Sequence, residues 1–267
     1  MSAMSAMSAM SALDQLFTKP GVKLIGYVPA GFPTITGAKE IIKAMVDGGV
    51  DAIEVGFPYS DPVMDGPTIQ AAADQSLANG TNSRDVMETL KYAATLAPAV
   101  IMSYWNPIEK YGVEKFAADM AEVGGSGTIT PDLTIEEAAP WINACKSNSL
   151  NSIFVIAPSS NDQRLEKVLK NCGGFVYAAS LMGVTGARAQ VSNAAEVLVK
   201  RARKYTKLPI CVGLGVSTGE QAAGVAKYAD GVIVGSAFIN AVLQAKDFQS
   251  GLTAVTKLAK ELKAGIS

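Results

Sequence analysis

The chain has 267 residues, of which 49% are hydrophobic and 18% are charged, so it is long and apolar enough for one domain with a large core. Its formal net charge of -1 indicates no basic surface for nucleic acid, and its apolar runs are far shorter than the roughly 20 residues of a membrane helix. Histidine is absent, and the cysteines show no metal-ligand spacing. We therefore expect a cytoplasmic protein that binds neither nucleic acid nor membranes and holds no metal, in which Cys145, Cys172 and Cys211 are reduced core residues.

Residues 1–20 begin with a repeated three-residue unit, MSAMSAMSAMSA, which has neither a charged start nor a sustained apolar stretch. Such a segment is a poor signal peptide. We expect residues 1–20 to form a flexible extension and entry segment, and residues 21–267 to form one domain without an internal linker.

From residue 22 onward, short apolar runs alternate with amphipathic segments typical of helices. Nearly continuous apolar strands that alternate with helices predict a parallel sheet covered on both faces. Eight such units predict an α/β fold, a single-domain TIM (β/α)8 barrel. A doubly wound open sheet is the alternative, but polar and Gly-rich signals at several strand ends favour the barrel. The predicted strands are residues 23–28, 52–55, 99–103, 127–130, 152–156, 175–178, 210–213 and 231–234, and the predicted helices are residues 37–47, 83–94, 113–123, 135–145, 162–171, 193–205, 218–228, 237–244 and 248–262.

The segment from Glu54 to Gln70 carries three carboxylates beside a strand that reads as buried. Glu54 is expected to be the last inward-pointing residue of this strand, where a charge is costly without a function or a partner. Asp61 and Asp65 follow in a loop stiffened by prolines and glycines, a composition that disfavours a helix. Without histidine, acid/base chemistry falls to carboxylates, Tyr, Lys or Cys. A buried ion pair for Glu54 and a loop or helix cap for Asp65 are the structural alternatives.

Glycine-rich segments follow the last three predicted strands, namely GVTG, GLG and GS. One such pair after a strand is usually only turn chemistry. Three of them, followed by a short helix whose N-terminus offers free N–H groups, are typical of a phosphate site in a barrel. The residues that we expect to bind phosphate are Gly186, Gly215, Gly235 and Ser236.

Several motifs now occur in a fixed order: GFPYSDPVMDGPTIQ, YWNP, TPDL, SLMGVTG, VGLGVS and VGSA. With them the chain closely resembles the tryptophan synthase alpha subunit family, from about Lys23 to the last helix. The resemblance implies a TIM barrel that cleaves indole-3-glycerol phosphate to indole and glyceraldehyde 3-phosphate. It also implies an α2β2 assembly in which the indole passes to a beta subunit, with no cofactor in the alpha subunit and pyridoxal phosphate only in the beta subunit.

Cleavage of this bond is a retro-aldol reaction, in which the ring carbon gains a proton, the side-chain hydroxyl loses one and the indole N–H is polarised. Two carboxylates in different environments can divide these steps. Glu54, among apolar neighbours, should have a raised pKa and act as the proton shuttle, whereas Asp65, on a more solvated loop, should stay ionised and accept from the indole N–H. The resemblance identifies both as the family's catalytic pair.

Other residues receive supporting roles. Asp61 lies in a turn-forming tripeptide and is expected to brace the loop. The resemblance implies that Tyr177 assists catalysis, with a buried structural tyrosine as the alternative. It also implies that Pro58, Asp61 and Asn106 belong to the face that meets the beta subunit.

A planar indole requires an apolar slot, and its expected walls could equally be ordinary barrel packing. The GVTG segment and residues 187–191 have the small, polar composition of a lid, in which Thr185 would touch Asp65 on closure. The expected walls are Tyr27, Ile69, Met102, Ile129 and Leu214.

Some positions differ from the usual family pattern: Thr134 stands where a proline often follows PDL, and Leu181 and Met182 precede GVTG where some members are more polar. These differences concern the lid and the fit to a beta subunit. Two other classes of protein remain open. A flavin-binding barrel oxidoreductase would be yellow, and a non-catalytic regulatory barrel would bind the substrate without releasing indole.

Overall fold

The structure is a computed structural model that describes residues 10–179, 188–213 and 215–267. Its strands form one parallel sheet in the order β5-β4-β3-β2-β1-β9-β8-β7-β6. The end members β5 and β6 are separated only by Phe154, so the sheet closes on itself through residues 151–156. The fold is thus the predicted TIM barrel, with the fifth predicted strand divided in two. The strands are β1 (Lys23–Pro29), β2 (Ala52–Gly56), β3 (Ala99–Met102), β4 (Gly127–Ile129), β5 (Asn151–Ile153), β6 (Val155–Ile156), β7 (Val176–Ala179), β8 (Ile210–Gly213) and β9 (Gly231–Val234).

The interior of the barrel is filled by side chains from alternate strand positions. In the register of the sheet, Ile25 lies opposite Ala52 and Ile233, and Tyr27 lies opposite Glu54 two residues further along. The positions level with Ile25 form an apolar inner core, and Tyr27 and Glu54 lie on its side toward the carboxyl ends of the strands. The inner core consists of Leu13, Ile25, Ala52, Val100, Ile129, Ile153, Phe175, Cys211 and Ile233.

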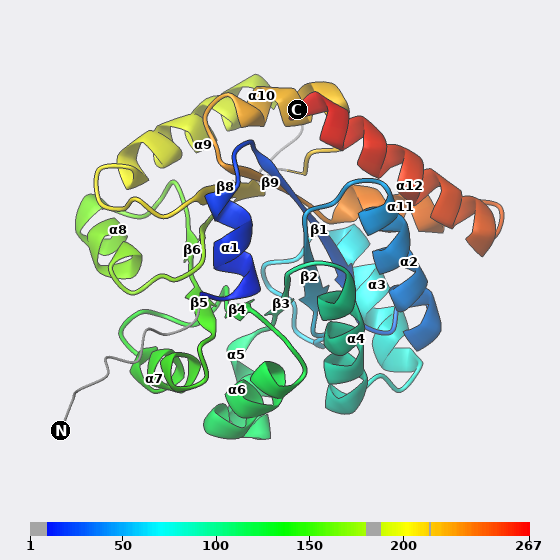
Figure 1. Cartoon of the computed structure of the whole chain (residues 1–267), viewed down its shortest axis with the longest axis horizontal. Coiled ribbons are helices and arrows are strands. Elements are labelled where there is room, and N and C mark those ends of the chain that lie inside the picture. The colour runs from blue at the N-terminus through cyan, green and yellow to red at the C-terminus, as the bar shows by residue number, and fades with distance from the viewer. Residues whose placement is uncertain (1–9, 180–187, 214) are drawn as a thin grey trace.

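Helices surround the sheet on its outer side (Figure 1), and a second, larger apolar cluster fills the space between them and the strands. The C-terminal helix α12 packs against α2, α10 and α11. None of the helices among the described residues is long and apolar enough to cross a membrane. The helices are α1 (Ala12–Thr18), α2 (Ile35–Asp47), α3 (Pro67–Ala78), α4 (Ser83–Leu96), α5 (Trp105–Tyr111), α6 (Val113–Glu122), α7 (Ala139–Ser147), α8 (Asp162–Leu169), α9 (Arg188–Ala202), α10 (Gly219–Ala226), α11 (Ser236–Leu243) and α12 (Phe248–Gly265).

We expected the boundary between a flexible extension and the barrel at residue 20, but helix α1 lies before it and packs against the barrel. Ser11 and Asp14 form a capping box at its start, and Leu13 is fully buried in the inner core. Asn151 of β5 donates to Ser11 Oγ at 2.9 Å. Residues 12–18 therefore belong to the barrel and cover one end of it (Figure 1), while residues 1–9 lie outside the described part. The sequence analysis missed this helix because seven residues are too few to show a clear helical pattern. A helix this short is stabilised by its packing against the barrel rather than by its own length.

Four further helices differ from the sequence prediction. Helix α9 begins at Arg188 rather than residue 193, so residues 188–191 of the expected lid are its first turn. Helix α3 begins inside the segment predicted as loop, with Pro67 in its first turn, a position that suits proline. The N-terminus of helix α5 is capped by a residue from a later loop, because Asp132 accepts from the N–H of Trp105 at 2.9 Å. Helix α7 begins at Ala139 rather than residue 135, and Pro140 lies in its first turn.

Candidate active site

Glu54 is the middle residue of β2 and occupies the next inward position after Ala52, level with Tyr27 and on the carboxyl side of the apolar inner core. Its side chain is only 3% exposed, and, among the residues that the structure describes, its Oε2 atom has no hydrogen-bond partner. Burial, reinforced by the negative charge of Asp65, raises the pKa of Glu54 to about 8. No described Lys or Arg forms an ion pair with it, so a structural ion pair does not explain its burial.

Asp65 lies in the loop between β2 and α3, where its Oδ2 atom accepts from the hydroxyl of Tyr104 at 3.2 Å. Burial raises the pKa of Asp65 to about 6, and the hydrogen bond from Tyr104 acts in the opposite direction. The side chain is less solvated than the sequence indicated, but its pKa remains below that of Glu54. The N-cap of α3 is Gly66 and has no side-chain hydrogen bond, so Asp65 is not a helix cap.

Tyr104 is a site residue that the sequence analysis quoted only as part of the YWNP motif. It is buried at the end of β3, just before α5, and its hydroxyl accepts from the N–H of Met64 at 2.9 Å while donating to Asp65. Through these two hydrogen bonds it links the loop that carries Asp65 to the end of β3. The signal that could have identified it is its place directly after a strand, one unit along from Glu54.

Two more tyrosines share the interior with the carboxylates. The negative charges of Glu54 and Asp65 contribute, after burial, to raising the pKa of both Tyr27 and Tyr177. Glycines make room for these rings: a Cβ at Gly56 would lie 2.3 Å from the Tyr27 hydroxyl, and one at Gly213 would lie 2.5 Å from the Tyr177 hydroxyl. Some glycines at the strand ends thus accommodate aromatic rings, a role that the sequence did not indicate.

The expected phosphate-binding residues are only partly described. Gly235 is the N-cap of α11 and Ser236 its first residue. The first helical hydrogen bonds to Gly235 O come from Phe238 and Ile239, at 3.0 and 3.2 Å. The N–H groups before them are therefore directed toward the carboxyl end of the barrel, as an anion site requires. Gly215 lies in the loop after β8 with φ +65°, whereas Gly186, and with it Thr185 of the expected lid, lies outside the described residues.

Comparison with known proteins adds to this geometry. A family model described as "Tryptophan synthase alpha chain" matches residues 13–267. The chain belongs to the tryptophan synthase alpha chain family. The alpha chain of Thermobifida fusca is 57% identical over 247 residues, which cover 91% of this chain and 92% of that protein, and the alpha chain of Streptomyces avermitilis is 55% identical, with 91% and 88% covered.

Solved structures agree with the family assignment. An aminoacrylate-bound tryptophan synthase from M. tuberculosis has a TM-score of 0.88 at 42% identity, covering 96% of this chain and all of that one. The alpha subunit of Legionella pneumophila tryptophan synthase has a TM-score of 0.87 at 31% identity, with 97% and 99% covered.

A tryptophan synthase alpha chain is a carbon–carbon lyase of tryptophan biosynthesis, and it catalyses the aldol cleavage of indole-3-glycerol phosphate with a beta subunit as partner. This assignment decides against the flavin oxidoreductase and the non-catalytic barrel. The resemblance inferred from the motifs is thereby confirmed.

The residues that we expected to enclose the indole fall into two groups according to their burial. Ile69 of α3 and Met102 of β3 are half-buried, whereas Tyr27 and Ile129 are buried in the interior. Leu214 lies outside the described residues. Both half-buried side chains pack against the larger apolar cluster between the helices and the strands.

The residues expected to meet the beta subunit differ in exposure, and Asn106 lies in α5 rather than in the loop. Pro58 is buried and Asn106 is half-buried, donating to the hydroxyl of Tyr59 at 3.1 Å. Asp61 is exposed and accepts from the Ser60 hydroxyl at 2.8 Å, rather than from the backbone N–H groups expected of a brace. Val63, which the sequence analysis did not single out, is 79% exposed on the same loop.

Proposed function

We propose that Glu54 and Asp65 carry the proton transfers of the cleavage. The observation that supports this division is the buried, unpaired carboxyl of Glu54, with a pKa of about 8, next to Asp65 with a pKa of about 6. At neutral pH the first is mainly protonated and the second mainly ionised. One group is therefore ready to give a proton and the other to accept a hydrogen bond.

In the proposed sequence, Glu54 donates its proton to the ring carbon that carries the glycerol chain. Asp65 accepts a hydrogen bond from the indole N–H and stabilises the positive charge that develops on the ring. The Glu54 carboxylate then removes the proton of the neighbouring side-chain hydroxyl, and the electron pair of the carbon–carbon bond returns to the ring. Indole and the aldehyde of glyceraldehyde 3-phosphate leave, and Glu54 is protonated again.

The remaining expected site residues orient the substrate in this proposal. The backbone of Gly235 and Ser236 at the start of α11, with Gly215 and Gly186, binds the phosphate. Tyr27, Ile69, Met102, Ile129 and Leu214 enclose the indole. Tyr177 supports the hydroxyl end of the substrate, and Thr185 closes over Asp65 as part of the lid.

The proposed assembly is an α2β2 tetramer in the cytoplasm. Pro58, Asp61 and Asn106 belong to the face that meets the beta subunit, and the exposed side chain of Val63 lies on the same loop. The proton transfers use only side chains of this chain, and we therefore expect pyridoxal phosphate in the beta subunit alone.

Two isosteric substitutions test the proposal. Glu54→Gln and Asp65→Asn should each lower the rate of indole release by roughly 10²–10⁴-fold, because each removes one proton-transfer or charge-stabilising group. Asp61→Asn is the matched control, since it makes the same change on the same loop at an exposed position. In assays of the alpha chain alone it should retain nearly full activity.

Circular dichroism and thermal unfolding should show that all three variants fold. Full activity of both Glu54→Gln and Asp65→Asn would contradict the assignment of the catalytic pair.

A further inference from the structure

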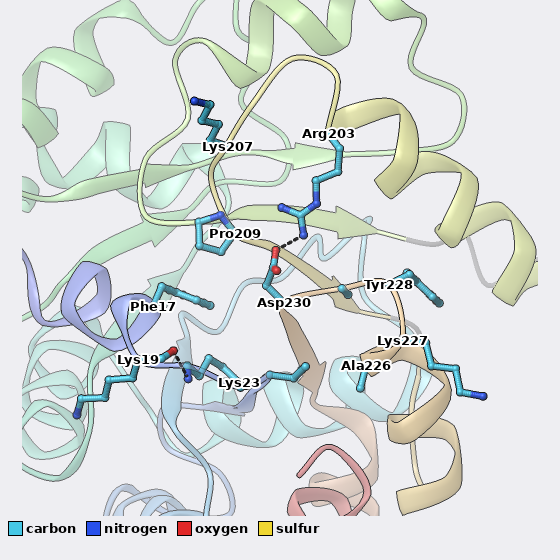
Figure 2. Close-up of a pocket in the computed structure, with 13 residues that line it drawn as sticks. Phe17, Lys19, Lys23, Arg203, Lys207, Pro209, Ala226, Lys227, Tyr228 and Asp230 are labelled. Carbon is cyan, nitrogen blue, oxygen red and sulfur yellow. Dashed lines mark hydrogen bonds and ion pairs between the residues drawn. The ribbon is translucent and has the colours of Figure 1, made fainter.

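A cavity of about 610 Å³ lies at the end of the barrel opposite Glu54, where the strands begin. We call it the basal hollow (Figure 2). It lies beside the first residue of β1, the residues just before β8 and β9, and the end of α1. Its charged lining residues are Lys19, Lys23, Arg203, Lys207, Lys227 and Asp230.

The basal hollow is strongly positive in a chain whose formal net charge is -1. Five basic side chains line it against one carboxylate. That carboxylate, Asp230, is already engaged: it accepts from the Arg203 guanidinium (Figure 2), and it accepts from the N–H of Ile210 at 2.7 Å. Among the described residues, Arg203 is the one lining cation that has an ion pair with a carboxylate. The four lysines therefore border the hollow without an ion pair to a described carboxylate. Lys19, Lys207 and Lys227 are exposed and extend outward around its rim (Figure 2), whereas Lys23 is buried.

Lys23 is the least expected member of this group. It occupies an inward position of β1 and is only 5% exposed, and its Nζ atom donates to the carbonyls of Lys19 and Pro20 at 2.9 and 2.8 Å. The nearby carboxylate of Asp51 is bound instead by Lys263 Nζ at 2.6 Å and by the N–H of Leu24. The described hydrogen bonds of Lys23 Nζ go only to carbonyls and leave it a third N–H; burial lowers the pKa of Lys23, and the negative charge of Asp51 acts in the opposite direction.

We propose that the basal hollow binds a small anion that carries two or more phosphate groups. Its volume is within the range of small-molecule sites, and lysines act on phosphates as movable point charges. Five basic groups spread around one cavity exceed the need of a single phosphate. The site is distinct from the substrate phosphate site, because it lies at the opposite end of the barrel.

Binding there should also stabilise the attachment of α1. Phe17 of α1 and the segment from Lys19 to Lys23 line the basal hollow together with residues before β8 and β9. An anion that bridges these segments binds only the folded arrangement. By linkage, it should raise the melting temperature of the whole chain.

Titration of the full chain with inorganic pyrophosphate at low ionic strength, followed by calorimetry, tests this proposal. Lys207→Gln combined with Lys227→Gln removes two exposed lining charges, and Lys110→Gln combined with Lys246→Gln removes two exposed charges elsewhere. We expect pyrophosphate to bind the unaltered chain more tightly than inorganic phosphate does. The first double variant should bind it at least about tenfold more weakly, and the control should bind within about twofold of the unaltered chain.

Three results with pyrophosphate would overturn the proposal: no pyrophosphate binding to the unaltered chain, equal weakening in both double variants, or undiminished binding in the first. The last result would place the anion at the carboxyl ends of the strands instead. A single-stranded RNA oligonucleotide that binds through Lys207 and Lys227 and is not displaced by pyrophosphate would equally contradict a small-anion site.

Discussion

Glu54 and Asp65 illustrate how position alone separates two carboxyl groups. Both are desolvated, but Glu54 has an oxygen without a described partner, whereas Asp65 accepts from Tyr104. Desolvation favours the neutral acid, and a donated hydrogen bond favours the carboxylate. The two groups therefore differ in pKa by enough to hold different protonation states at neutral pH.

This difference predicts a bell-shaped dependence of kcat/KM on pH for the alpha chain alone. Activity should rise through about pH 6 as Asp65 loses its proton and fall through about pH 8 as Glu54 loses its own. The limbs report the coupled pair rather than isolated residues. Indole release measured at constant ionic strength checks the profile, and activity that still rises above pH 8 would contradict a protonated Glu54.

Tyr104→Phe is predicted to move the lower limb. Loss of the hydroxyl removes the hydrogen bond that lowers the pKa of Asp65, so the limb should shift to higher pH, and kcat/KM near neutral pH should fall roughly three- to tenfold. Tyr59→Phe is the matched control, because its ring lies 5.3 Å from that of Tyr104 but its hydroxyl is paired with Asn106. An unchanged lower limb in Tyr104→Phe would mean that the hydroxyl does not position Asp65.

At the residue scale, the strand pattern was sufficient to place Glu54 in the barrel interior, because alternation is a property of the local sequence, although Glu54 is the middle rather than the last residue of its strand. The environment of Asp65 was not predictable in the same way. Its partner Tyr104 lies 39 positions away, and only the closing of neighbouring strands brings the two together. The role of Gly56 and Gly213 was likewise not predictable, because the tyrosine ring that each accommodates comes from another strand.

Shortening the buried side chain of Leu13 in helix α1 should measurably lower the free energy of unfolding. Leu13→Ala should lower the free energy of unfolding by roughly 2–4 kcal/mol, because Leu13 is fully buried in the inner core. Met10→Ala, at a position that is 54% exposed, should change it by less than about 0.5 kcal/mol. Urea unfolding followed by circular dichroism compares the two. Equal effects would contradict the packing of α1 against the barrel.

Among the elements, the eight strand positions and the longer amphipathic helices were predictable because their periodicity is strong. Two of the missed helices are short. Helices α1 and α5 have seven residues each, and α5 takes its cap from Asp132 in a later loop. The break at Phe154 was also not predictable, because it depends on how β5 and β6 pair with different neighbours.

For the molecule as a whole, Glu54 makes stability depend on pH. Its folded pKa of about 8 exceeds the ordinary value of 4.5, so the folded chain keeps a proton that the unfolded chain loses, and stability falls as pH rises between these values. Between about pH 6.5 and about pH 8, this group should remove roughly 2 kcal/mol from the free energy of unfolding.

Glu54→Gln should abolish this part of the pH dependence, because the amide does not titrate. Glu122→Gln, at an exposed position, is the control and should keep it. Urea unfolding at several pH values measures the difference. A slope that persists in Glu54→Gln would show that other groups cause it.

The pairing of β1 with β9 and the ion pair between Asp51 and Lys263 have a consequence for synthesis of the chain. During translation β1 can pair with β2 early, but its other edge stays open until the last strand has left the ribosome. An unpaired strand edge is a template for pairing with other chains. The nascent protein therefore remains an incomplete barrel until β9 has been made, and helix α12, which carries Lys263, then joins the segment before β2 to a part of the chain made after β9.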